Sequence, residues 1–121
     1  MEKEKTALQL AGEYLLNLKF NPRLMGYKLL REAIVLATKK GGRPFLLKKD
    51  IYPALTEKYR IKTANLERNI SNSIENAFLS VDIEIMESIF GNTISAKTGK
   101  PTVKELIAAA AAHIFIYGLF L

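Results

Sequence analysis

The sequence predicts an all-α fold of about six helices, arranged as one compact domain over residues 1–121. Apolar side chains recur every three or four positions through most of the chain, which is the period of an amphipathic helix. No stretch of any length alternates apolar and polar residues as a half-buried strand does. With 121 residues, 49% of them hydrophobic, the chain is long enough to bury a substantial core.

The first two helices are predicted from apolar stripes separated by turn signals. The first is expected over residues 4–18, with one apolar side formed by Leu8, Ala11, Leu15 and Leu18. The second is expected over residues 22–40, because an Asn-Pro pair at 21–22 favours a helix start and a Gly-Gly pair at 41–42 favours a stop. Its inner stripe comprises Tyr27, Leu30, Ile34 and Ala37.

The third and fourth helices lie on either side of a short basic connection, KYRIK at 58–62. The third helix is expected over residues 47–59, with Pro53 in its first turn or at a kink because proline lacks a backbone donor. The fourth is expected over residues 63–78, with Thr63 as its N-cap. Two apolar stripes support these helices: Leu47, Ile51, Leu55 and Tyr59 in the third, and Leu66, Ile70, Ile74 and Phe78, with the small Ser73 and Ala77, in the fourth.

The remainder of the chain predicts two more helices. A short fifth helix is expected after a connection at 80–82, with Asp82 as its cap and an apolar side formed by Ile85, Met86, Ile89 and Phe90. Gly91 ends it, and a loop follows to residue 101. The last helix is expected to begin at a capping box formed by Thr102 and Glu105, and it is strongly apolar.

The outward face of the fourth helix carries the side chains that most favour nucleic-acid recognition. Amide, hydroxyl and charged groups gather there, from Asn65, Glu67, Arg68, Ser71, Asn72 and Glu75. Asn and Arg make paired hydrogen bonds to adenine and guanine edges in the major groove of DNA. A helix, a tight connection and a second helix with such a face are typical of a helix-turn-helix. The spacing is also compatible with an amphipathic helix whose polar face is merely solvated.

Positive charge is concentrated beside this helix pair. The chain has a formal net charge of +6 and an isoelectric point of about 9.6. Residues 39–68 hold nine Lys or Arg against three acidic residues, whereas residues 69–96 hold four acidic residues and no Lys or Arg. A basic window next to a reading helix is expected of a protein that binds the phosphate backbone. A basic surface that only aids solubility is the alternative.

Motifs and composition argue against an enzyme. A Gly-rich nucleotide loop, an HExxH motif and a nucleophile elbow are all absent from the sequence. His113 is the only histidine, and on an apolar helix it is expected to be a packed or rim residue. The chain has no cysteine, which excludes disulfides and thiolate metal sites and fits a reducing cytoplasm. We therefore expect no catalytic residue, metal or cofactor, and a cytoplasmic protein associated with the nucleoid.

Several runs of residues resemble one known family. They are GYKLLREAI at 26–34, IYP at 51–53, LER at 66–68, IENAF at 74–78, SIFGNTIS at 88–95, and KPT at 100–102 followed by ELIA at 105–108. Over residues 14–112 the chain is similar to the C-terminal DNA-binding domain of the stage 0 sporulation protein A response regulators, which start sporulation. The resemblance implies a six-helix fold, with a supporting helix at 47–59 and a recognition helix at 64–78 in the major groove.

The resemblance also implies partners and contact residues. Family members bind a short DNA box, often in tandem as dimers, and regulate transcription, and the segment corresponding to 79–92 touches the RNA polymerase sigma factor. Base contacts are then expected from Asn65, Glu67, Arg68, Ser71 and Asn72. Phosphate contacts are expected from Lys48, Lys49, Lys58, Lys62, Lys97 and Lys100. Because Asn65 and Ser71 stand where the family has arginines, and Asn72 where a His is common, we expect an altered sequence preference.

Two further departures from the family concern the organisation of the chain. The phosphorylatable receiver domain is not within these 121 residues, so we expect a stand-alone relative or an excised effector domain. Residues 113–121 form a divergent apolar tail. The apolar run at 106–121 is shorter than the roughly 20 residues that span a bilayer, so we expect it to pack on the core and leave an apolar tip.

The apolar tip leaves a second function class open. The chain could keep the fold but bind DNA weakly, and act as a protein-interaction module or decoy that pairs through residues 114–121. We do not expect a membrane partner, although a tail that touches a membrane and an altered terminus are alternatives that the sequence leaves open.

Overall fold

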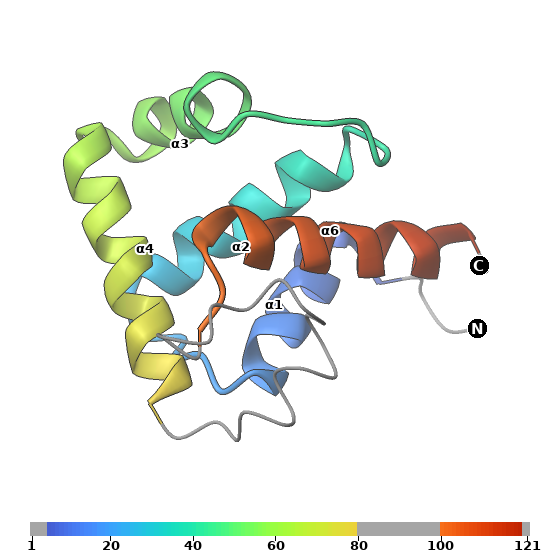
Figure 1. Cartoon of the computed structure of the whole chain (residues 1–121), viewed down its shortest axis with the longest axis horizontal. Helices are drawn as coiled ribbons and strands as arrows, with labels where there is room; N and C mark the ends of the chain where they lie inside the picture. The colour runs from blue at the N-terminus through green and yellow to red at the C-terminus, as the bar shows by residue number, and fades with distance from the viewer. Residues whose placement is uncertain (1–4, 80–99, 120–121) are drawn as a thin grey trace.

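The computed structural model describes residues 5–79 and 100–119, which form five α-helices and one π-helical turn (Figure 1). The elements are α1 (Ala7–Asn17), α2 (Met25–Thr38), the π-helical turn η1 (Leu47–Ile51), α3 (Tyr52–Tyr59), α4 (Thr63–Phe78) and α6 (Val103–Leu119). No strand occurs within these residues, in agreement with the all-α prediction. The fifth helix predicted around residues 85–90 lies outside the described residues, so the described part has five α-helices where about six were expected for the chain.

The central helix is α2, which packs against α1, α4 and α6. Its inward side chains are fully buried in one apolar cluster that also takes in the inner faces of α4 and α6. Figure 1 shows α4 along one edge of the molecule, with α3 at its N-terminal end, and the last turns of α6 at the opposite side. One face of α4 is therefore fixed to the core while the other is turned outward.

The crossing of α2 and α4 is very close, and a glycine makes it so. A Cβ atom on Gly26 would lie 2.2 Å from the backbone oxygen of Asn69 and 2.5 Å from Cβ of Ser73. Carbon atoms do not approach a backbone oxygen that closely, so a residue with a side chain at position 26 would push α4 outward. Gly26 thus sets the distance of α4 from the core.

Two helix starts differ from the predictions. A turn occupies residues 21–24, because the side-chain oxygen of Asn21 accepts the N–H of Arg23 at 2.9 Å, so α2 begins at Met25 rather than at residue 22. The N-cap of α4 is Lys62, whose φ of −77° and ψ of 153° are extended, and Thr63 is already helical. The predicted Thr63 cap is therefore wrong: the connection from α3 is so short that the extended residue is Lys62.

Two other helix signals are confirmed. The N–H of Glu105 donates to Oγ1 of Thr102 at 3.1 Å, and the N–H of Thr102 donates to Oε1 of Glu105 at 2.8 Å, which is the predicted capping box. Gly41 and Gly42 follow α2 with positive φ angles of 63° and 86°. A second capping box, T-x-x-Q at 6–9, starts α1 where sequence reasoning had placed no signal.

Candidate nucleic-acid interface

The candidate interface is the outward face of α4. The predicted inner stripe of this helix is buried throughout: Leu66, Ile70, Ser73, Ile74, Ala77 and Phe78. The predicted base-contacting residues are all exposed: Asn65, Glu67, Arg68, Ser71 and Asn72. An apolar ridge on one side holds the helix in place, so the polar strip on the other side is both fixed in position and accessible.

Within this strip, Asn65 and Arg68 are already in contact. Nη2 of Arg68 donates to Oδ1 of Asn65 at 3.1 Å, one helical turn apart. The backbone oxygen of Asn65 also accepts Nδ2 of Asn69 at 2.8 Å. Amide and guanidinium groups are thus presented side by side near the start of α4, and these are the groups that read adenine and guanine.

The negative charge of Glu67 acts on the supporting helix. Burial, and then the negative charge of Glu67, raises the pKa of the Tyr52 hydroxyl at the start of α3. The carboxylate of Glu67 is itself exposed, so it remains available as an acceptor. Glu67 thus combines an exposed position with a charge that acts on a buried residue of α3.

The predicted supporting helix is made of two pieces, η1 and α3. Oδ2 of Asp50 accepts the backbone N–H of Leu46 at 2.7 Å, and this bond, aided by Lys40, holds the pKa of Asp50 below its usual range. Pro53 lies in the first turn of α3, as predicted. The predicted continuous helix over residues 47–59 is therefore a π-helical turn that tightens into an α-helix just before the proline.

The predicted phosphate-contacting lysines fall into two groups. Three are exposed and form no ion pair within the described residues: Lys48, Lys49 and Lys62. Lys58, in contrast, pairs with Glu32 of α2, and Nζ of Lys100 lies 2.9 Å from Oε1 of Glu75. Lys97 lies outside the described residues. Lys58 and Lys100 would have to exchange a carboxylate for a phosphate, whereas the first three would not.

Glu32 joins α3 to α2, a connection that sequence reasoning missed. Its two carboxylate oxygens accept Nζ of Lys58 and the hydroxyl of Tyr59. Partial burial acts to raise the pKa of Glu32, but the hydrogen bonds from Lys58 and Tyr59 and the charges of Lys58 and Arg31 bring it below its usual range. Burial, and then the bond to Glu32, raises the pKa of Tyr59 to about 12. The partners are 26 and 27 residues apart in the chain, so no local spacing could have signalled this cluster.

We expect this cluster to make stability depend on pH at both extremes. Because the folded pKa of Glu32 is lowered, its contribution is present above the pKa of an unfolded glutamate, about 4.3, and is lost as the pH falls below it. Because the folded pKa of Tyr59 is raised, its contribution is present below about pH 10 and is lost as the pH rises towards 12. Thermal unfolding at several pH values should therefore show a shallower acid fall for Glu32→Gln and a shallower alkaline fall for Tyr59→Phe. Curves parallel to the parent in both ranges would contradict the expectation.

A comparison with known families now bears on this geometry. Residues 12–114 match the family described as sporulation initiation factor Spo0A C terminal. The chain belongs to the Spo0A C-terminal family. The match includes all of η1, α3 and α4, so the whole helix-turn-helix lies inside it. This family is the DNA-binding domain of a sporulation regulator, and it is not enzymatic. No solved structure matches the chain.

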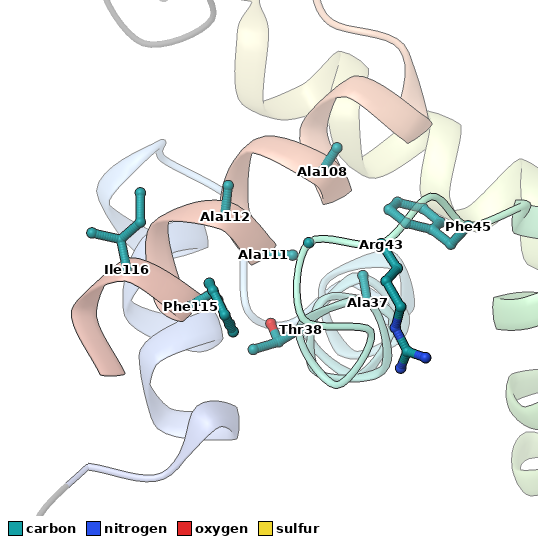
Figure 2. A pocket seen from close by; sticks show the side chains of 10 residues that line it. Ala37, Thr38, Arg43, Phe45, Ala108, Ala111, Ala112, Phe115 and Ile116 are labelled. Atoms are coloured by element: carbon teal, nitrogen blue, oxygen red, sulfur yellow. The ribbon is translucent and has the colours of Figure 1, made fainter. Parts of the chain in front are cut away.

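Away from α4, this member of the Spo0A C-terminal family has an apolar groove of about 270 Å³ between α2, the loop after it, and α6 (Figure 2). Thr38 of α2 faces Phe115 of α6 across it, Ala37 lies nearer to Ala111, and Phe45 lies at its other end. Ile116 is 52% exposed. The predicted apolar tip is thus partly exposed beside a groove, while the helix that carries it packs on the core.

Three other features of the Spo0A-family chain bear on the sequence predictions. His113 is exposed, and its ring centroid lies 5.5 Å from that of Tyr14, so it is a rim residue as predicted. Of the segment 79–92, only Leu79 is described, and it is exposed. None of the helices in residues 5–79 and 100–119 has the length and hydropathy needed to cross a membrane.

Proposed function

We propose that the chain is a sequence-specific DNA-binding transcription regulator of the Spo0A type, with α4 in the major groove. The observation that carries this proposal is the exposed Asn65–Arg68 pair on a helix whose other face is locked in the core. The major groove is about 12 Å wide and admits an α-helix with its side chains. With 16 residues, α4 is roughly 24 Å long, enough to cross the groove and still reach the protein core.

The base contacts we propose are those of the exposed strip. Arg68 would bind guanine through N7 and O6, Asn65 would bind adenine or steady Arg68, and Glu67 would accept from the amino group of cytosine. Ser71 and Asn72 lie one turn further along α4 and would contact the adjoining bases. Since Asn65 and Ser71 replace arginines of the family pattern, we propose a DNA sequence preference that differs from that of the family.

The phosphate contacts we propose come from both ends of the supporting helix. Lys48 and Lys49 lie on η1, Lys62 precedes α4, and none of the three has to leave an acid first. Lys58 and Lys100 would contribute less, because each must part from its carboxylate, and Lys97 is proposed from the resemblance alone. The resemblance alone is also the basis for three further proposals: tandem dimers on DNA, a sigma-factor contact through residues 79–92, and association with the nucleoid.

Selection of bound duplexes from a random pool at physiological salt tests the proposed function. Enrichment of one defined motif is the expected result, since directed side chains on a rigid helix discriminate between base pairs. If the sequences of the bound duplexes stay random after several rounds of selection, the proposed function is contradicted. Duplexes carrying the enriched motif then serve as the ligand for the variants described below.

Salt dependence separates the two groups of lysines. Replacing Lys62 by Gln should reduce the slope of log affinity against log salt by about 0.9, because one phosphate contact is lost. Replacing Lys58 by Gln should change that slope less, since its ion pair with Glu32 competes with phosphate. Fluorescence anisotropy titrations on the selected motif over a range of salt concentrations measure both slopes. Equal reductions for the two variants would refute the distinction.

A second function is favoured by the apolar tip of α6. Phe115, Ile116 and Tyr117 are each more than a third exposed, next to the groove of Figure 2. A protein-interaction module or decoy would use these side chains to pair with a relative and would bind DNA weakly. In that case the random pool would yield no motif, whereas the chain would associate through α6.

A further inference from the structure

The connection between α3 and α4 contains a conformational outlier, Arg60. It has a φ of 52° and a ψ of 48°, in the left-handed region that residues with a Cβ adopt at a cost and that glycine adopts freely. The chain must leave α3 at Tyr59 and start α4 at Thr63, and the N–H of Ile61 closes this turn on the oxygen of Thr56 at 3.2 Å. The turn therefore requires the left-handed conformation but does not require an arginine.

No contact within the described residues accounts for the side chain of Arg60. It is exposed, and its guanidinium has no hydrogen bond, ion pair or ring contact there. Its backbone does make a contact, because the N–H of Arg60 donates to the backbone oxygen of Thr56. Residues held in such strained backbone conformations cluster at active sites and ligand-binding sites, so the conformation of Arg60 motivates a search for an external partner.

The position of Arg60 indicates which partner. It precedes Lys62 by two residues and Asn65 by five, so it stands at the end of α4 that carries the Asn65–Arg68 pair. A guanidinium binds two phosphate oxygens at once through its fixed fork of donors. We propose that Arg60 is a DNA phosphate contact, aimed at the backbone by the left-handed turn that joins the two helices. This inference rests on the proposed function of α4.

The chain provides a matched control at Lys19. This residue also has a positive φ, 71°, and is also exposed, and the N–H of Phe20 closes its turn on the oxygen of Leu15 at 3.0 Å. The ring of Phe20 lies against that of Phe78, with 5.9 Å between centroids. Lys19 is therefore at the far end of α4, roughly 24 Å from the start of the helix. Replacing it by glycine removes the same charge and relieves the same strain, but away from the proposed contact.

The experiment compares Arg60→Gly, Arg60→Lys and Lys19→Gly for melting temperature and for binding to the selected duplex. Both glycine variants should melt higher, by about 4 °C, because each relieves a left-handed residue. Only Arg60→Gly should lose affinity, on the order of fivefold near 0.15 M salt, with a salt slope reduced by about 0.9. Arg60→Lys keeps the charge and should keep most of the slope.

The possible outcomes distinguish a failure of this inference from a failure of the DNA-binding function proposed for α4. If Arg60→Gly melts higher but binds with the salt slope of the parent, Arg60 is not a phosphate contact, although the proposed function stands. Equal losses of slope for Arg60→Gly and Lys19→Gly would reflect net charge alone and would also overturn the inference. If the parent binds no duplex with a measurable salt dependence, the proposed function and the inference both fail.

Discussion

The Gly26→Ala variant is expected to lose about 3 kcal/mol of its free energy of unfolding, at the upper end of what overpacking usually costs. The new Cβ would meet the backbone oxygen of Asn69 at 2.2 Å, and a backbone atom cannot rotate away as the end of a side chain can. Relief therefore requires α4 to move outward, which opens the buried contacts of its inner stripe. DNA binding should fall as well, because the exposed polar strip of α4 moves with the helix.

Urea unfolding followed by circular dichroism measures this loss, and Ser73→Ala provides its control. Oγ of Ser73 is buried without a hydrogen-bond partner among the described residues, and it would lie 2.9 Å from the new Cβ. Removing it takes away one obstacle but leaves the oxygen of Asn69 in place. The penalty of Gly26→Ala should thus persist in a Ser73→Ala background. A Gly26→Ala midpoint equal to that of the parent would show that the crossing is looser than described.

The Arg68→Ala variant is expected to lose about 1–3 kcal/mol of discrimination at one base pair of the selected motif, roughly 5- to 150-fold. Arg68 is exposed, is positioned by its bond to Asn65, and carries the fork of donors that fits the two acceptors of guanine. Affinity for duplexes with the wrong base at that position should change little. The measurement is a set of anisotropy titrations against the motif and its single-base variants.

Arg68→Lys separates base reading from charge. It keeps the positive charge, so the salt slope should stay near that of the parent, but it lacks the planar fork and should lose most of the discrimination. If Arg68→Ala instead weakened binding to every duplex by the same factor and lowered the salt slope, Arg68 would be a phosphate contact. Another residue on the outward face of α4 would then have to make the contact to guanine.

The helices and their buried faces could be predicted from the sequence because both are local properties. The four-residue spacing of Leu66, Ile70 and Ile74 fixes which side of α4 meets the core, and the structure buries all three. The capping box at Thr102 is equally local and was equally predictable. Thr63 was predicted wrongly because the choice between cap and first residue depends on the turn geometry before it.

What could not be predicted depends on residues far apart in the chain. The close crossing at Gly26 involves α4, and GYKLLREAI gives no hint of which helix the glycine faces. Likewise, the basic window suggested that Lys58 is free for phosphate, whereas Glu32 of α2 binds it. Charge counting along a sequence identifies a basic region, but the ion pairs within it are set by the packing of separate helices.

The placement of α4 and the end of α6 on opposite sides of the domain has a consequence for assembly (Figure 1). A duplex lying along α4 and a protein seated on Phe115 and Ile116 would be separated by the full width of the helical core. Neither would block the other, so the two proposed contacts are sterically compatible with one another.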